Sequence, residues 1–224
     1  MRSETNTQQY VGVDVGTSAV RVVVGTVDEQ GRPEIIGFSQ IDNNGMRRGV
    51  VAHVDEVADT NAGLIGPIII AKREFASQDG VPRDVSREFI SLFTVFDENA
   101  SVHLATNLAA CSGICDPDAD EFQESNLMHS INGLVYGNNL GYSMRKGERV
   151  RWYILGMGTE VDLHSPHWHG ATLLHNGNRL DVTEVLPAAT KTLDMQPDVL
   201  GRWMYHCHVN DHINAGMMTN FIVE

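Results

Sequence analysis

The stretch His206-Cys-His-Val-Asn-Asp-His-Ile-Asn-Ala-Gly-Met217 concentrates metal-ligating side chains near the end of the chain. It follows a β-prone run, residues 201–205, so we expect His206, Cys207 and His208 to lie on a β-strand. Side chains on a strand alternate between its two faces. Cys207 then points to one face and the two histidines to the other, and the tripeptide predicts two metal sites on opposite faces of a sheet.

The cysteine face has the residues of a copper site. His212 and Met217 follow Cys207 across a turn that ends at Gly216. With one further histidine, for which His164 is the natural candidate, they supply two imidazoles, a thiolate and a thioether. This is the ligand set of a blue copper electron-transfer site with a weak axial methionine.

A second motif, His164-Ser-Pro-His-Trp-His-Gly170, supplies histidines for the other face. His167 and His169 are two residues apart, so they share a face and can meet His206 and His208. Four imidazoles without a carboxylate or thiolate suit copper that binds oxygen. Zinc is the alternative metal, because histidine and cysteine bind it readily, and each residue taken alone also fits an ordinary core or surface position.

The rest of the chain is typical of a β protein. Its 224 residues are 42% hydrophobic and 20% charged, which indicates a folded chain with one large domain or a domain plus a fragment. From residue 61 onward, short β-rich runs alternate with turn residues, so we predict a mainly β sandwich or barrel. The runs are 64–70, 89–96, 149–155, 171–174, 179–185, 191–195, 201–206 and 217–223. Residues 116–125 are expected to form an acidic loop with a helical turn.

Charge excludes some partners. The net charge is −13, and only five basic and six acidic residues lie in the first 50. Such an acidic surface disfavours nucleic acid and anionic membranes. No apolar run is long enough to span a membrane, and the polar start of the chain predicts a cytoplasmic protein. In that compartment we expect Cys111 and Cys115 to stay reduced, whereas in an oxidising compartment they could form a strained disulfide.

Residues 51–224 resemble the multicopper oxidases of the ceruloplasmin and hephaestin ferroxidase type. The resemblance rests on both histidine motifs and on Leu92-Phe-Thr-Val-Phe-Asp-Glu-Asn, Glu124-Ser-Asn-Leu-Met-His-Ser-Ile-Asn-Gly-Leu and Glu148-Arg-Val-Arg-Trp-Tyr-Ile-Leu-Gly. It implies a cupredoxin Greek-key β-sandwich at 87–224, preceded at 51–86 by the last strand of a lost first cupredoxin domain and a linker.

The resemblance also assigns the site residues. Type 1 copper would bind His164, Cys207, His212 and Met217, and half of a type 2/3 cluster would bind His167, His169, His206 and His208. Iron, as substrate, would bind Glu124, His129 and Asp211. In this family electrons pass from Fe(II) or another reductant to type 1 copper. They then pass through the catalytic residues, here Cys207, His206 and His208, to the cluster, which reduces O2 to water.

The cluster is incomplete in this chain. The family uses eight histidines, and the only further match is His53, so a homo-oligomer or a second cupredoxin domain would have to supply the others. Whether the chain is an enzyme by itself is therefore left open.

The first 50 residues have a different character. Their apolar runs predict two strands joined by a Gly-Thr-Ser turn and a third strand, which is too small a sheet for an independent domain. Residues 9–50 resemble the start of FtsA, an actin-like cell-division ATPase, and would make the chain chimeric. The resemblance places Asp14, Gly16, Thr17 and Ser18 in a phosphate loop. A nucleotide-binding actin-like fragment that carries a passive cupredoxin domain is thus the alternative function, although no second phosphate loop is present.

Overall fold

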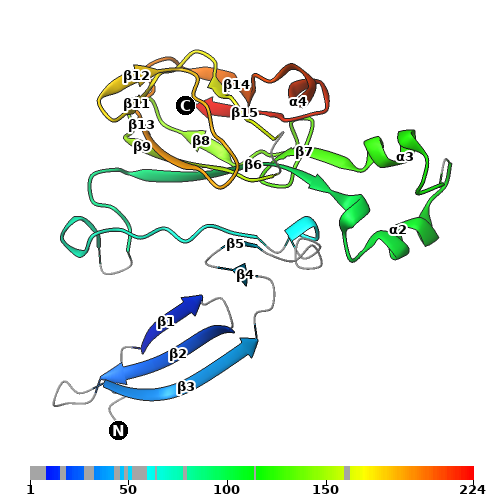
Figure 1. The fold of residues 1–224 in the computed structure, drawn as a ribbon. Coiled ribbons are helices and arrows are strands. Elements are labelled where there is room, and N and C mark those ends of the chain that lie inside the picture. The colour runs from blue at the N-terminus through cyan, green and yellow to red at the C-terminus, as the bar shows by residue number, and fades with distance from the viewer. Residues whose placement is uncertain are drawn as a thin grey trace, which may run out of the picture. The chain divides into compact units, whose positions relative to one another are not determined.

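The structure is a computed structural model that describes residues 9–15, 19–27, 33–42, 46–47, 50–51, 60–63, 65–77, 80–113, 115–158 and 162–224. The chain divides into two compact units, residues 1–59 and 60–224 (Figure 1). Among the described residues, no helix is long and apolar enough to cross a membrane.

The first unit holds a small antiparallel sheet in the order β1-β2-β3. Its strands are β1 (Gln9–Val15), β2 (Ala19–Val27) and β3 (Pro33–Asp42), and a separate short pair is formed by β4 (Met46–Arg47) and β5 (Val50–Val51). The three predicted strands are confirmed. Asp14 lies in β1, whereas Gly16, Thr17 and Ser18 lie outside the described residues, so the phosphate loop and the FtsA resemblance stay predictions.

The second unit is a sandwich of two sheets, which confirms the mainly β prediction. One sheet has six strands in the order β12-β11-β13-β9-β6-β7, and the other has four in the order β10-β14-β15-β8. The six are β12 (Asn178–Leu180), β11 (Leu173–His175), β13 (Thr190–Met195), β9 (Val150–Gly156), β6 (Arg87–Asp97) and β7 (Leu127–Ile131). The four are β10 (Pro166–Trp168), β14 (Gly201–Cys207), β15 (Met218–Val223) and β8 (Tyr142–Met144).

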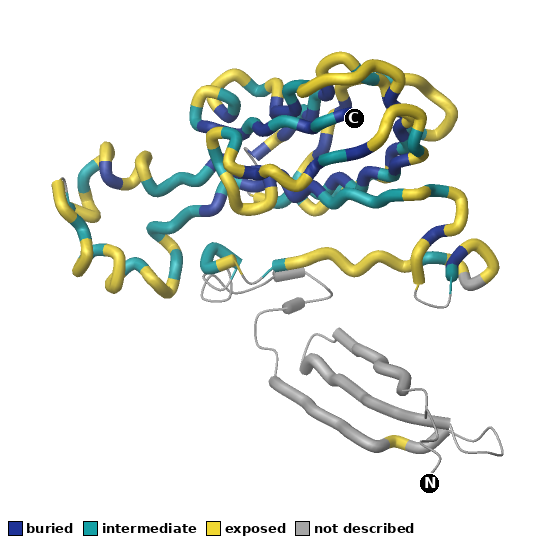
Figure 2. Tube along the Cα trace, turned by 180° about the vertical axis from the view of Figure 1, so that it is seen from behind, coloured by how far each residue is buried: buried dark blue, intermediate teal, exposed yellow. Residues whose placement is uncertain are grey.

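The core lies between these two sheets. Along β9 the residues Val150, Trp152 and Ile154 are fully buried and alternate with Arg151 and Tyr153 on the outer face. This period of two is what a strand with one covered face requires. Figure 2 shows the same contrast, with dark blue segments gathered in the sandwich and yellow over the connecting segments.

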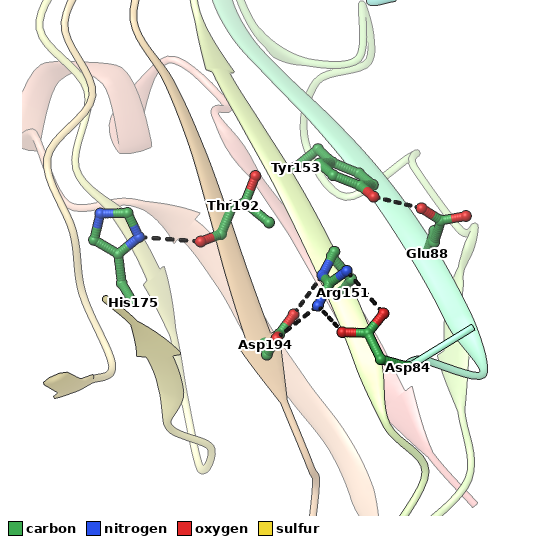
Figure 3. Close-up of polar contacts among 7 residues, drawn as sticks. All are labelled: Asp84, Glu88, Arg151, Tyr153, His175, Thr192 and Asp194. Carbon is green, nitrogen blue, oxygen red and sulfur yellow. Dashed lines mark hydrogen bonds and ion pairs between the residues drawn. The ribbon is translucent and has the colours of Figure 1, made fainter. Parts of the chain in front are cut away.

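The outer face of the six-stranded sheet carries a polar network (Figure 3). Arg151 on β9 binds Asp194 on β13 and Asp84 ahead of β6, each at 2.7 Å. The Tyr153 hydroxyl donates to Glu88 at 2.5 Å. Arg151 therefore connects three segments that are far apart in the sequence.

Helices interrupt the β pattern in one region. They are α2 (Leu104–Ala110) and α3 (Asp120–Ser125), with the 3₁₀ turn η2 (Glu98–Ala100) before them. Figure 1 shows α2 and α3 projecting from one end of the sandwich. Elsewhere lie η1 (Arg73–Phe75) and α4 (Asn210–Asn214). The helical turn predicted within 116–125 is confirmed as α3.

Three predictions need correction. The run 64–70 is not a strand: among the described residues, none in 66–71 forms a backbone hydrogen bond, and Pro67 lacks a donor. Strands β7, β8 and β10 were not expected, because β8 and β10 have only three residues each and the apolar residues of β7 are interrupted by His129 and Ser130. Cys111 and Cys115 form a disulfide with a Cα–Cα distance of 5.9 Å, so the predicted reduced pair is wrong. The turn between α2 and α3 brings the two cysteines within bonding range.

Candidate metal centre

Two groups of metal-ligating side chains converge at the end of the sandwich that carries β10 and β14. The cysteine group consists of His164, Cys207 and His212, and the histidine group of His167, His169 and His206. In each group the ligand atoms all lie within 4.8 Å of one another.

The strand pairing explains how one short sequence serves both groups. Strands β10 and β14 pair antiparallel, with Pro166 opposite Cys207 and His167 opposite His206. Since neighbouring side chains on a strand point to opposite faces, Cys207 joins the buried group and His206 the other. The single peptide bond between them links the two groups covalently.

The cysteine group is buried, and its three residues lie close enough together to share one metal ion. His164, Cys207 and His212 are at most 4% exposed. The Cys207 sulfur lies 3.7 Å from Nδ1 of His212. His164 Nε2 donates to the Met157 carbonyl at 3.3 Å, whereas its buried Nδ1 has no hydrogen-bond partner among the described residues. A ring with one nitrogen bonded to a carbonyl and the other bare is oriented as a metal ligand requires.

Met217 lies beside this group through the backbone. Its N–H donates to the His212 carbonyl at 2.9 Å, and its carbonyl accepts from the Cys207 N–H at 3.0 Å. The α4 turn thereby returns the chain to Cys207, and the Met217 side chain is fully buried.

Burial sets the protonation of the cysteine group. It lowers the pKa of His164 to about 4 and lowers the pKa of His212, which the nearby His129 lowers further. Burial also raises the pKa of the Cys207 thiol, and the Ser165 N–H, which donates to its sulfur at 3.3 Å, opposes that effect. At neutral pH the imidazoles are therefore ready to bind a cation, and binding must displace the thiol proton.

The histidine group brings three ring nitrogens together. His206 Nε2 lies 3.2 Å from Nδ1 of His167 and 3.0 Å from Nε2 of His169, while Nδ1 of His206 is 2.7 Å from the Cys207 carbonyl. Burial lowers the pKa values of both His206 and His167. His208 is exposed, with its ring 5.3 Å from that of His167 and 5.4 Å from that of His206.

The predicted iron residues are only partly brought together. The His129 ring lies 5.0 Å from that of His212, next to which Asp211 stands in the sequence. Glu124 instead lines an open pocket of about 550 Å³ together with Asp97 and Asp120. His53 lies outside the described residues.

Two neighbours of the ligands were missed from the sequence. Ser165 contacts Cys207 through its backbone, and an oxygen of Asp181 lies 3.9 Å from Nε2 of His167. Ser165 could have been found from its place inside the histidine motif. No spacing signal pointed to Asp181, because only strand pairing brings it to His167.

The residues present fit copper. The cysteine group offers a thiolate and two imidazoles with an unpartnered buried nitrogen, the set that copper electron-transfer sites use. The histidine group offers imidazoles only, which also suit copper.

Comparison with known proteins agrees with this chemistry. Residues 114–224 match the family model described as "Multicopper oxidase". Ceruloplasmin of Homo sapiens is 40% identical over 197 residues, which covers 85% of this chain and 18% of ceruloplasmin. Hephaestin of Homo sapiens is 43% identical over 178 residues, which covers 76% of this chain and 15% of hephaestin. The chain therefore spans less than a fifth of the length of these relatives.

A solved structure supports the fold. The crystal structure of a multicopper oxidase aligns with a TM-score of 0.51 at 14% identity, covering 94% of this chain and 57% of that one. The sandwich is thus of the cupredoxin kind found in these oxidases. Residues 114–224 form a multicopper oxidase domain related to ceruloplasmin and hephaestin, and the metal that this family binds is copper.

Proposed function

We propose that the chain is the electron-accepting domain of a ferroxidase-like multicopper oxidase. The cysteine group with Met217 would hold type 1 copper, and the histidine group with His208 would hold half of a type 2/3 cluster. The observation that carries the proposal is the direct peptide link between Cys207 in one group and His206 in the other, each surrounded by its own converging donors.

Copper, when bound, would supply one-electron redox chemistry at the cysteine group and the reduction of O2 to water at the histidine group. The chain's own residues prepare these sites. Burial excludes water from Cys207, and the Ser165 N–H bonded to its sulfur stabilises the thiolate. The Met157 carbonyl accepts a hydrogen bond from Nε2 of His164 and fixes its ring, so that Nδ1 is the nitrogen that would bind copper.

Fe(II) is the proposed substrate. Carboxylate oxygens and an imidazole suit iron, and His129 lies against the ring of His212, while Asp211 is its sequence neighbour. Glu124 is the third proposed ligand. Asp97 and Asp120, which share its pocket, would hold cations near it by their charge.

The cluster needs histidines from elsewhere. Four of its ligands would be His167, His169, His206 and His208, and His53 is a fifth candidate. A second copy of this chain or another cupredoxin domain would supply the rest, and without it we expect electron acceptance but no turnover of O2.

The disulfide provides evidence about the cellular compartment of the protein. Disulfides persist in oxidising compartments and are rare in the cytoplasm, so the Cys111–Cys115 bond favours a compartment outside the reducing cytoplasm that the sequence predicted.

Titration with Cu(II) tests the cysteine group. We expect the full chain to gain an intense blue thiolate-to-copper absorption, and Cys207→Ser to abolish it. The double variant Cys111→Ser/Cys115→Ser is the matched control and should keep the colour, because those sulfurs are bonded to each other. A colourless protein, or one that takes up zinc alone, would sink the type 1 assignment.

Measuring oxygen consumption with Fe(II) tests the proposal that O2 reduction needs histidines from a partner. Turnover should appear only in preparations in which sedimentation shows association and metal analysis shows more than one copper per chain. Turnover by a monomer with one copper would contradict the need for a partner.

A further inference from the structure

Four oxidisable aromatic side chains fill the core behind the two ligand groups. The aromatic group consists of Tyr142, Trp152, Trp168 and Tyr205, each at most 4% exposed. The Trp168 and Tyr205 rings stack with centroids 4.8 Å apart and planes inclined by 26°. Trp152 lies 5.2 Å from Tyr205, 5.7 Å from Trp168 and 4.9 Å from Tyr142.

This group begins beside the ligands. Trp168 stands between His167 and His169 in β10, and its register partner Tyr205 directly precedes His206 in β14. Because side chains alternate along a strand, the two rings point into the core while the histidine group gathers on the opposite face. Phe93, with its ring 5.6 Å from Tyr205 and 5.9 Å from His164, also connects the aromatic group to the cysteine group.

The other end reaches the surface. The Tyr142 hydroxyl accepts from Nδ2 of Asn132 at 3.0 Å, and Asn132 is exposed. Neighbouring rings therefore lead to a solvent-exposed amide from the cysteine group through Phe93, and from the two strands that carry the histidine group.

Packing does not explain the polar atoms of these rings. Buried indole N–H and phenol O–H groups usually find a hydrogen-bond partner. Within the described part of the chain, Trp152 Nε1 and Trp168 Nε1 have none. An unpaired buried donor costs about 1–3 kcal/mol, a cost that phenylalanine would avoid, although it would leave part of the tryptophan volume empty. Besides size and the polar atom, tryptophan and tyrosine differ from phenylalanine in ready one-electron oxidation.

We propose that the aromatic group, with Trp168 as its first member, is a redox relay that gives single electrons to oxidants formed at the histidine group. The proposal rests on the proposed function, since it needs copper and a peroxide at that group. Copper held by His167, His169 and His206 would supply the one-electron reduction of hydrogen peroxide, which leaves hydroxide and a hydroxyl-level oxidant. This oxidant takes one electron from the Trp168 indole and becomes a second hydroxide.

The indole radical cation keeps its Nε1 proton, because no described residue accepts a hydrogen bond from that nitrogen. Trp152 then gives one electron to Trp168, and Tyr142 gives one to Trp152 while its hydroxyl proton shifts along the hydrogen bond to the Ile90 carbonyl. A one-electron reductant such as Fe(II), arriving near the exposed Asn132, returns the electron to Tyr142 as the proton moves back. The relay would thus spare the histidine ligands from oxidation.

The test compares oxidation products in copper-loaded full-length protein that carries Trp203→Phe. Trp203 is outside the aromatic group and donates to the Val199 carbonyl, so this background leaves Trp152 and Trp168 as the tryptophans. After reduction and addition of hydrogen peroxide, we expect a freeze-quenched organic radical by electron paramagnetic resonance. Peptide mapping should find added oxygen mainly on Trp168 and Trp152. Adding Trp168→Phe should remove most of the radical and increase oxidation of His167, His169 and His206 several-fold.

Phe221→Leu in the same background is the matched control. It removes a buried ring that packs on Trp152, at 6.4 Å, but cannot be oxidised so readily. Histidine oxidation that is equal with and without Trp168, or that rises as much with Phe221→Leu, would overturn the relay.

Failure to bind copper would contradict the proposed function and not the relay. It is detected before peroxide is added, from the metal content and the blue absorption. In that case the metal-free Trp203→Phe protein is oxidised with photogenerated ruthenium(III). An indole radical that Trp168→Phe removes supports the relay, and the lack of such a radical contradicts it.

Discussion

At the scale of single residues, His164 links burial to pH. Its pKa is about 4 in the folded protein, because burial disfavours the charged ring, against an ordinary value of 6.5. Above pH 6.5 the ring is neutral in both states and its contribution to stability is complete. As the pH falls toward 4 the unfolded chain takes up the proton first, so stability is lost in this window.

We therefore expect the metal-free protein to lose about 3 kcal/mol of unfolding free energy through His164 between pH 6.5 and 4. His164→Leu, which cannot be protonated, should flatten this part of the profile in urea denaturation. His103→Asn, a change at an exposed histidine, should leave the slope unchanged. An identical slope in all three proteins would refute the assignment.

Gly170 is the last residue of the second histidine motif, and the Trp203 ring lies where a side chain at this position would be. It has a φ of +65°, and an added Cβ would lie 2.3 Å from Cε3 of Trp203. Gly177 has a similar φ of +82° with nothing within 4 Å. Both Gly→Ala changes strain the backbone, but only Gly170→Ala overpacks a ring. We expect it to cost about 1–3 kcal/mol more than Gly177→Ala in thermal or urea unfolding, and equal costs would show that the ring moves freely.

At the scale of elements, Arg151 joins β9 to β13 and to the segment before β6 (Figure 3). Its guanidinium holds the pKa of Asp84 below the ordinary value, although burial opposes this weakly. The two carboxylates are 49% and 44% exposed, so solvent screens the pairs.

Arg151→Ala should therefore lower the unfolding free energy by about 1–2 kcal/mol, and less at high salt. Arg151→Lys should recover less than half of this loss, since lysine lacks the planar fork that binds two carboxylates. Arg202→Ala, at an exposed position of the other sheet, is the control for lost positive charge and should have little effect. A full recovery by lysine would show that charge alone matters.

The elements also show where sequence patterns succeed. Strands β6, β9, β13, β14 and β15 were predicted, because each has several apolar residues in alternation or in a continuous run. Strand β10 has three residues, Pro-His-Trp, and gains its hydrogen bonds from distant segments, β14 on one side and residues 181–183 on the other. The seven residues of α2, Leu-Ala-Thr-Asn-Leu-Ala-Ala, are too few for a helical period to stand out in the sequence, and none of them is buried.

At the scale of the whole molecule, the two ligand groups were visible in the sequence because each depends on local alternation. How deeply these groups are buried could not be predicted from the sequence. Cys207 is fully buried, and among the described residues His164 Nδ1 has no hydrogen-bond partner, because of packing between segments far apart in the chain. The neighbours of the ligands that come from distant segments, such as Asp181 beside His167, depend on strand order in the same way.

The division into two units leads to a prediction for the chain as a whole. Both ligand groups, the core of the sandwich and the disulfide lie within residues 60–224. If unit 60–224 carries its own stability, the protein shortened to these residues should unfold in one cooperative transition with unchanged midpoint. It should also gain the same blue absorption with Cu(II) as the full chain, and Cys207→Ser within it should again be colourless. A shortened protein that aggregates, or that binds copper without colour, would mean that residues 1–59 are needed to complete the fold of the copper-binding unit.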